Sequence, residues 1–77
     1  MAETMLVDAR GSFCPGPLME LITTLKRAQV GDVLELLSSD AGSAKDVPEW
    51  VRKVGHVMER TEQDPAGVWH LFVRKAK

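Results

Sequence analysis

Residues 18–37, LMELITTLKRAQVGDVLELL, contain two different spacings of apolar side chains. In the first half, the apolar residues fall on one helical stripe, formed by Leu18, Leu21, Ile22, Leu25 and Ala28. Gly31 then suits the left-handed C-terminal cap of a helix. Residues 33–37 are a nearly continuous apolar run, as in an interior strand. The segment therefore predicts a helix that leads into a buried strand.

Alternating patterns predict three further strands. Residues 4–9 alternate in the manner of a short strand. A weaker strand is expected at about 56–62, and a stronger one at 68–75, where Trp69, Leu71 and Val73 alternate with His70, Phe72 and Arg74. Residues 64–67, Asp-Pro-Ala-Gly, have the composition of a turn. We therefore expect the last two strands to form a hairpin.

A second helix is predicted between the strand at 33–37 and this hairpin. The stripe consists of Val47, Trp50, Val51 and Val54, and Gly55 ends it. Proline is tolerated only in the first turn of a helix, so Pro48 places the helix start near residue 47. Residues 38–46 are then a polar loop, and Asp46 is a candidate cap for the helix.

These elements predict one domain over residues 1–77 in the order βαβαββ. Two right-handed crossover helices lie on the same face of a sheet when its strands step in one direction. The expected fold is therefore an α/β (α+β) two-layer sandwich with both helices on one face. Leu6 and Phe72 are expected on the open face, and Trp50 and Trp69 are expected to pack in the core.

Composition excludes several classes of function. Ten Lys and Arg against eleven Asp and Glu give a formal charge of −1, which is not the electrostatic footprint of a nucleic-acid binder. No segment approaches the roughly 20 apolar residues of a membrane span, and the N-terminus lacks the pattern of a secretory signal. We therefore expect a cytoplasmic protein without nucleic-acid or membrane partners. One cysteine and two histidines without ligand spacing predict no metal, and we expect a monomer or weak oligomer.

The only cysteine lies in residues 13–18, FCPGPL. Because proline is accepted only at the start of a helix, Pro15 and Pro17 place that start in this stretch. In one register Cys14 is the N-cap and Pro15 the first helical residue, and Phe13 packs against Leu18 as a hydrophobic staple. In the other register the helix begins at Pro17 and Cys14 lies just outside it.

In either register, the Cys14 thiol would lie near a helix N-terminus, which favours an anion by about 0.3–1 kcal/mol and so lowers a thiol pKa. Gly16 is the only backbone donor nearby, since neither proline has an N–H. Arg10 would assist the thiolate, whereas Asp40 and Asp46, in the loop expected to face Cys14, would oppose it. A buried packing role for the cysteine is the alternative.

Two stretches of the sequence resemble the recurring motifs of one protein family. Residues 8–17, DARGSFCPGP, and 40–50, DAGSAKDVPEW, are similar to those of the TusA/SirA-like sulfur-carrier family. The resemblance covers nearly the whole chain and implies a mixed four-stranded sheet with two helices. It also implies that Cys14 is the functional residue, supported by Pro15, Gly16, Pro17, Arg10 and Asp46.

The resemblance implies a carrier rather than an autonomous enzyme, and no cofactor. A cysteine desulfurase or rhodanese-type donor would load sulfane sulfur on Cys14 as a persulfide, and a DsrE-type or other thiol protein would accept it. The family serves tRNA thiolation, sulfur oxidation, molybdenum-cofactor supply or selenium metabolism. A solitary cysteine favours transfer between proteins over a dithiol redox cycle. A thiol redox sensor or a non-catalytic interaction module remain the alternatives.

Overall fold

The computed structural model describes residues 4–13 and 16–77. Its elements follow the predicted order: β1 (Thr4–Asp8), α1 (Gly16–Arg27), β2 (Val33–Ser38), α2 (Ala41–Lys53), β3 (Val57–Gln63) and β4 (Trp69–Arg74). The βαβαββ order expected from the apolar spacing is therefore confirmed. None of the helices in these two described ranges is long and apolar enough to cross a membrane.

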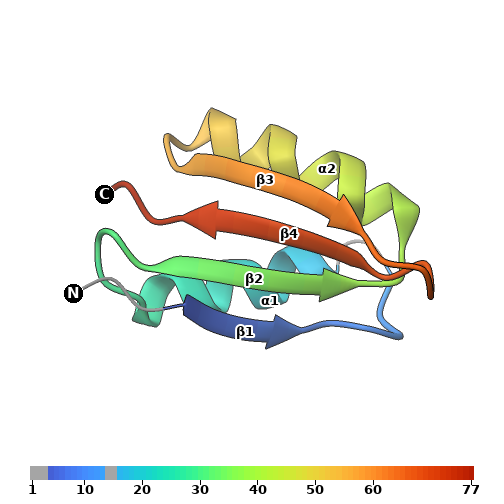
Figure 1. Cartoon of the computed structure of the whole chain (residues 1–77). Coiled ribbons are helices and arrows are strands. Elements are labelled where there is room, and N and C mark those ends of the chain that lie inside the picture. Colours follow the sequence, from blue (N-terminus) through green and yellow to red (C-terminus); the bar gives the residue numbers. More distant parts are fainter. Residues whose placement is uncertain (1–3, 14–15) are drawn as a thin grey trace.

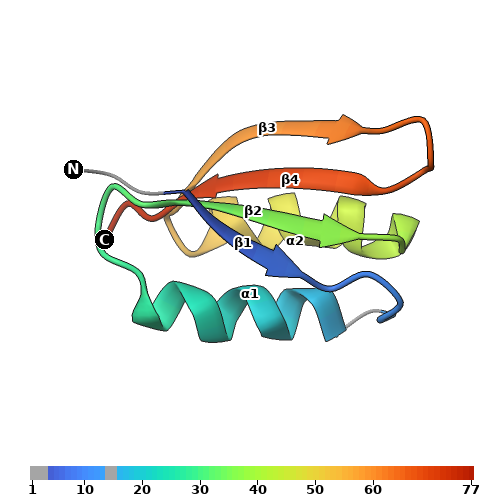
Figure 2. The same cartoon turned by 60° about the horizontal axis from the view of Figure 1, so that its bottom comes forward.

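The four strands form one mixed sheet in the order β1-β2-β4-β3 (Figure 1). β1 pairs with β2 in parallel, whereas β4 is antiparallel to both of its neighbours, β2 and β3. Both helices cover the same face of the sheet, as Figure 2 shows. Each crossover steps in the same direction across the sheet, so right-handed connections place both helices on one side. The predicted two-layer sandwich is confirmed.

The core lies between the helices and the covered face of the sheet. The side chains in it come from every layer and are at most 3% exposed: Leu21, Leu25, Leu34, Leu36, Val47, Val51, Leu71 and Val73. Burial of such side chains contributes about 1.5–3 kcal/mol each. Trp50 packs against this cluster as predicted, whereas Trp69 is only half-buried and does not belong to it.

The predicted start of α2 is wrong. The helix begins at Ala41, and its N-cap is Asp40, whose carboxylate accepts hydrogen bonds from the backbone N–H groups of Gly42 and Ser43. Asp46 is therefore not the cap, because it lies inside the helix. Pro48 also lies inside the helix and has no N–H for the Ala44 carbonyl, which costs about 3 kcal/mol relative to alanine.

Two features of α2 offset this cost. The Asp40 side chain accepts hydrogen bonds from Gly42 N at 3.4 Å, Ser43 N at 3.1 Å and the Ser43 hydroxyl at 2.9 Å. Val47 and Val51, on either side of Pro48, are both fully buried against the sheet. Capping and packing together keep the segment helical, although the local signal of the proline favours a later start.

The other face of the sheet carries paired polar and apolar side chains. Leu6 is 64% exposed, and Phe72 is half-buried with the Arg60 guanidinium 4.0 Å from its ring centroid. Both residues lie on the open face, as expected. β3 forms one edge of the sheet, and its residues 59–63 are all exposed.

Candidate functional site

The loop between β1 and α1 begins the candidate site. Ala9 N donates to the Leu37 carbonyl at 2.9 Å and continues the pairing of β1 with β2. Gly11 has φ +85°, a conformation that side chains with a Cβ rarely adopt, and its N–H donates to the Ser39 hydroxyl at 3.0 Å. This bond fixes the β1–α1 loop beside the β2–α2 loop, at the same edge of the sheet.

The structure describes the residues before and after the first two positions of the cysteine motif. Cys14 and Pro15 lie outside the described residues, so the predicted N-cap role of Cys14 and its position facing residues 38–46 stay predictions. Phe13 and Gly16 flank them, and Gly16 N donates to the Phe13 carbonyl at 2.7 Å. This hydrogen bond therefore connects the backbone before the two prolines with the first residue of α1.

α1 begins within the motif, as the two prolines predict. Gly16 is its first residue and Pro17, the second, is buried. A Cβ added to Gly16 would lie 3.1 Å from the Ser12 Cβ, so the glycine lets the loop pack tightly on the first turn of the helix.

Exposed apolar side chains border the motif. Phe13 is 76% exposed and Met19, in the first turn of α1, is 55% exposed. Leu18 packs against the core while Phe13 is mostly exposed, and the staple between them, which needs Cys14 as the N-cap, stays a prediction. Apolar side chains displayed beside a functional segment are typical of surfaces that contact other proteins.

Arg10 forms an ion pair with a neighbouring carboxylate. Its Nε donates to Asp8 Oδ1 at 2.9 Å and its Nη2 to Asp8 Oδ2 at 2.7 Å. The side-chain and backbone hydrogen bonds from Arg10 lower the pKa of Asp8 to about 2, and the same pair raises the pKa of Arg10. Much of the positive charge expected to assist a thiolate is thus compensated by Asp8.

The two aspartates expected near the thiol have different positions. Asp40 caps α2, so its carboxylate is fixed at the start of that helix, one residue after Ser39, which contacts the β1–α1 loop. Asp46 is exposed and lies further along α2, beyond the first turn of that helix. Of the two, Asp40 is the one that the backbone of the β2–α2 loop fixes at this edge.

A histidine between two carboxylates lies at the same edge, on the open face. His70 Nδ1 is 2.8 Å from Glu35 Oε2, and His70 Nε2 is 3.0 Å from Asp64 Oδ2. Hydrogen bonds to Asp64 and then to Glu35 raise the pKa of His70, and His70 in turn lowers the pKa of Asp64. His70 is a strand residue as predicted, but its partners were not predicted from the sequence. The only signal was a glutamate inside the apolar run of residues 33–37.

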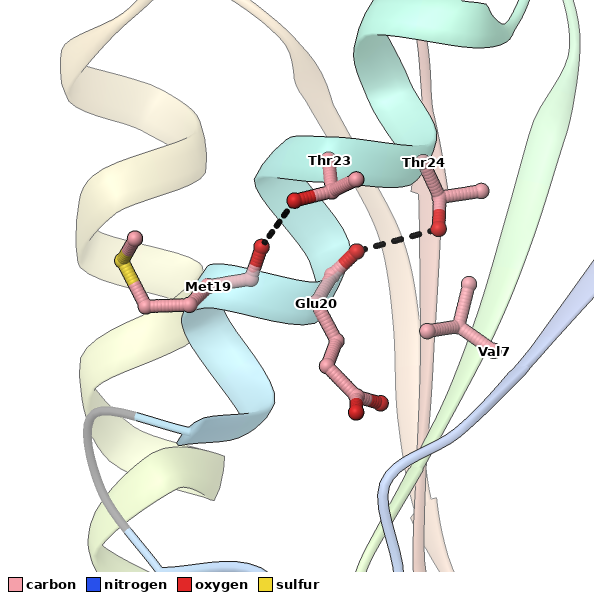
Figure 3. A pocket seen from close by; sticks show the side chains of 5 residues that line it. All are labelled: Val7, Met19, Glu20, Thr23 and Thr24. Carbon is pink, nitrogen blue, oxygen red and sulfur yellow. Dashed lines mark hydrogen bonds between the residues drawn. The ribbon is translucent and has the colours of Figure 1, made fainter.

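A groove lies between β1 and α1, with a volume of about 330 Å³ (Figure 3). It is lined by Val7, Met19, Glu20, Thr23 and Thr24. The two threonine hydroxyls donate to the helix carbonyls of Met19 and Glu20, both at 3.0 Å. The groove is therefore lined largely by carbon atoms, and it includes the exposed Met19 beside the motif.

Among residues 4–13 and 16–77, no group of three or more His, Cys, Asp or Glu side chains has a geometry that could hold a metal ion.

The chain is a small α/β protein, a two-layer βαβαββ sandwich with its Cys-Pro-Gly-Pro sequence between the first strand and the end of the first turn of the first helix. Residues 5–75 match the family model described as "Sulfurtransferase TusA". The chain belongs to this family of sulfur carriers, as the two sequence motifs indicated.

Similar proteins agree with this assignment. A protein of Archaeoglobus fulgidus named "Putative sulfur carrier protein" is 55% identical over 95% of this chain and 99% of its own length. The sulfur carrier protein TusA of Pseudomonas putida is 30% identical over 91% of this chain and 86% of its own. The crystal structure of a SirA-like protein from Desulfitobacterium hafniense has the same fold, with a TM-score of 0.81 and 20% identity over 97% of this chain and 99% of that one.

Proposed function

We propose that this protein carries sulfane sulfur as a persulfide on Cys14 and transfers it to a cysteine of an acceptor protein. The observation that carries this proposal is the position of the only cysteine of the chain, within the motif of the sulfur-carrier family and directly before α1. The names of the similar proteins support the carrier role.

Each transfer step is a thiol exchange that needs no external oxidant. The Cys14 thiolate attacks the outer sulfur of a donor persulfide, and the sulfur–sulfur bond of the donor breaks as the donor thiolate leaves. Cys14 then holds the outer sulfur. An acceptor thiolate attacks that sulfur in turn, the bond to Cys14 breaks, and Cys14 leaves as the thiolate. The chain has no second cysteine that could displace the sulfur as an internal disulfide.

The described surroundings of the motif suit such a transfer. α1 begins at Gly16, and the positive end of a helix favours a nearby thiolate. Exposed Phe13 and Met19 give a partner protein apolar surface to bury on either side of the motif. Gly11 bound to Ser39, and Gly16 bound to Phe13, hold the chain on both sides of the cysteine. A held loop loses less conformational freedom when a partner binds.

The partners follow from the chemistry. A donor must present a persulfide, as a cysteine desulfurase or a rhodanese-type protein does, and an acceptor must present a reactive thiol, as a DsrE-type protein would. Both are proteins, and both steps require thiols to stay reduced, which places the proposed relay in the cytoplasm. Transfer between proteins also agrees with a carrier that is monomeric or weakly oligomeric.

The test is an intact-mass measurement after incubation with a cysteine desulfurase and cysteine, and separately with a rhodanese and thiosulfate. The expected result is a gain of one sulfur atom that a reducing agent removes. Cys14→Ser should gain none while it keeps its fold by circular dichroism. Met19→Ser, which leaves the thiol in place, is the matched variant and should still load. Absence of the added sulfur with both donors, or its presence in Cys14→Ser, would contradict the proposal.

A further inference from the structure

A second cavity lies at the far end of the molecule from the cysteine motif. It has a volume of about 270 Å³ and lies between the C-terminal halves of α1 and α2. In Figures 1 and 2 these helix ends lie near the start of β2, while the β1–α1 loop lies at the opposite end of the sheet. The cavity therefore has no part in the proposed sulfur chemistry.

The walls of this cavity are apolar. Ile22 and Leu25 of α1 face Trp50 and Val54 at the end of α2. The His56 ring lies near Trp50, with ring centroids 6.3 Å apart and planes tilted by 42°. Such walls suit the apolar or aromatic part of a small organic molecule, because ligand pockets are mostly carbon-lined with a few polar groups.

The charged side chains around the cavity are all cationic. Lys26, Lys75 and Lys77 line it, and none of the described residues that line it is acidic. No ion pair between described residues includes any of these three lysines. The charged side chains that line the cavity therefore contribute only positive charge.

One of the three lysines has a structural role. Lys75 Nζ donates to the carbonyls of Leu25 at 2.7 Å and Ala28 at 2.8 Å, and so satisfies the C-terminal end of α1. The partial negative charge at that helix end is thus already opposed by a full positive charge. Lys26 and Lys77 remain as cations for a ligand.

His56 supplies a directional donor. Its Nδ1 accepts a hydrogen bond from Ala76 N at 3.1 Å, so the neutral ring carries its proton on Nε2. Partial burial, and then the charges of Lys75 and Lys77, lower the pKa of His56. The ring is therefore neutral at pH 7 and can donate from Nε2 to an anionic oxygen.

We propose that this cavity binds a small amphipathic carboxylate. The apolar part of the ligand lies between Ile22, Trp50 and Val54, and the carboxylate lies near Lys26, Lys77 and the His56 ring. The volume is slightly below that of common ligand pockets, so the ligand is limited to one or two rings or a short aliphatic chain.

The test uses 2-naphthoate as the probe and uncharged 2-naphthamide as its isostere, each titrated into the ¹⁵N-labelled full chain. The naphthoate should shift the indole N–H signal of Trp50 and the amides of residues 54–56, and leave the indole of Trp69 unchanged. The amide should bind roughly tenfold more weakly, because charge-assisted hydrogen bonds are lost.

Variants identify the cationic contacts. Lys26→Gln and Lys77→Gln should each weaken naphthoate binding by about two- to fivefold, as expected for partly exposed charge pairs. Lys45→Gln removes an exposed lysine from the other end of α2 and should leave the affinity unchanged. Cys14→Ser should bind as the unmodified chain does.

Two results would overturn the proposal. One is the absence of any Trp50 shift up to roughly 10 mM naphthoate, a range that covers weak ligands. The other is equal affinity for the acid and the amide, together with unchanged affinity in Lys26→Gln and Lys77→Gln. These lysines would then have only the role of stabilising helix ends.

Discussion

The two faces of the sheet are stabilised in different ways. On the covered face, Leu34, Leu36, Leu71 and Val73 are fully buried beneath the helices, and none of them carries a polar group. On the open face the contacts are between charged and aromatic groups, including His70 with its two carboxylates and Arg60 over Phe72. The covered face therefore holds most of the stability, while the open face makes that stability depend on pH and salt.

Among the variants that test this difference between the two faces, Leu21→Ala is expected to change the free energy of unfolding most. Leu21 is fully buried between α1 and the sheet, so its truncation should lower the free energy of unfolding by about 2–5 kcal/mol. Urea denaturation measures this loss. Leu6→Ala, at a position that is 64% exposed on the open face, is the matched control and should change stability by less than about 0.5 kcal/mol. Comparable losses in both variants would contradict the contrast.

The next effect concerns the helix layer and the true start of α2. Asp40→Ala removes the cap that accepts from Gly42 and Ser43 and should cost about 0.5–2 kcal/mol. Asp46→Ala should cost less, because Asp46 lies inside the helix, where alanine is well tolerated. Thermal unfolding followed by circular dichroism compares them. A larger loss for Asp46→Ala would place the start of the helix where the sequence suggested.

A smaller effect, with a characteristic pH dependence, is expected on the open face. The pKa of His70 is raised above 6.5, so its contribution to stability is complete below pH 6.5 and is lost as the pH rises through the folded-state pKa. The pKa of Asp64 is lowered below 3.8, so its contribution is present above that pH and is lost as the pH falls further. His70→Gln should therefore destabilise most between about pH 4 and 6.5.

His56 provides the control with the opposite sign. Its pKa is lowered, so the unmodified chain should gain stability relative to His56→Gln as the pH rises through 6.5. Urea midpoints measured across this pH range test both histidines. A His70 ring signal that titrates at a lower pH than that of His56 would contradict the assignment.

The smallest effect on stability is expected at the border of the motif. Phe13→Ser removes a side chain that is 76% exposed, so the free energy of unfolding should change by less than about 0.5 kcal/mol. Sulfur transfer from a donor protein should nevertheless become slower, because the partner loses an apolar contact. Loading rates by mass spectrometry separate the two effects. A large loss of stability would show that Phe13 packs on the fold rather than serves partners.

Local sequence patterns predicted most of the fold. The spacing at residues 18–28 and 33–37 located α1 and β2, because burial imposes the helical and strand periods directly on the sequence. The start of α2 was missed because the local penalty of Pro48 is offset by the Asp40 cap and by the burial of Val47 and Val51. The spacing of apolar residues does not show whether the cost of a proline or the stabilisation from capping and burial is larger.

The candidate site was predicted in part. The two prolines correctly placed the start of α1 in the motif, since their missing N–H groups disfavour positions beyond the first turn of a helix. The contacts of His70 could not be predicted, because they depend on β4 lying between β2 and β3, an order that local pattern does not contain. The ion pair between Arg10 and Asp8 could not be predicted either, because it depends on the backbone conformation that brings these two side chains together.

The outer strand β3 has a consequence for how the protein behaves in a crowded cell. Its exposed residues 59–63 read ERTEQ, so the free edge of the sheet presents charge where an added strand would have to pair. Charged side chains on an edge strand discourage its pairing with a strand of another molecule. The β3 edge is therefore a poor template for an added strand from another molecule, unlike the β1 edge, where Leu6 is exposed.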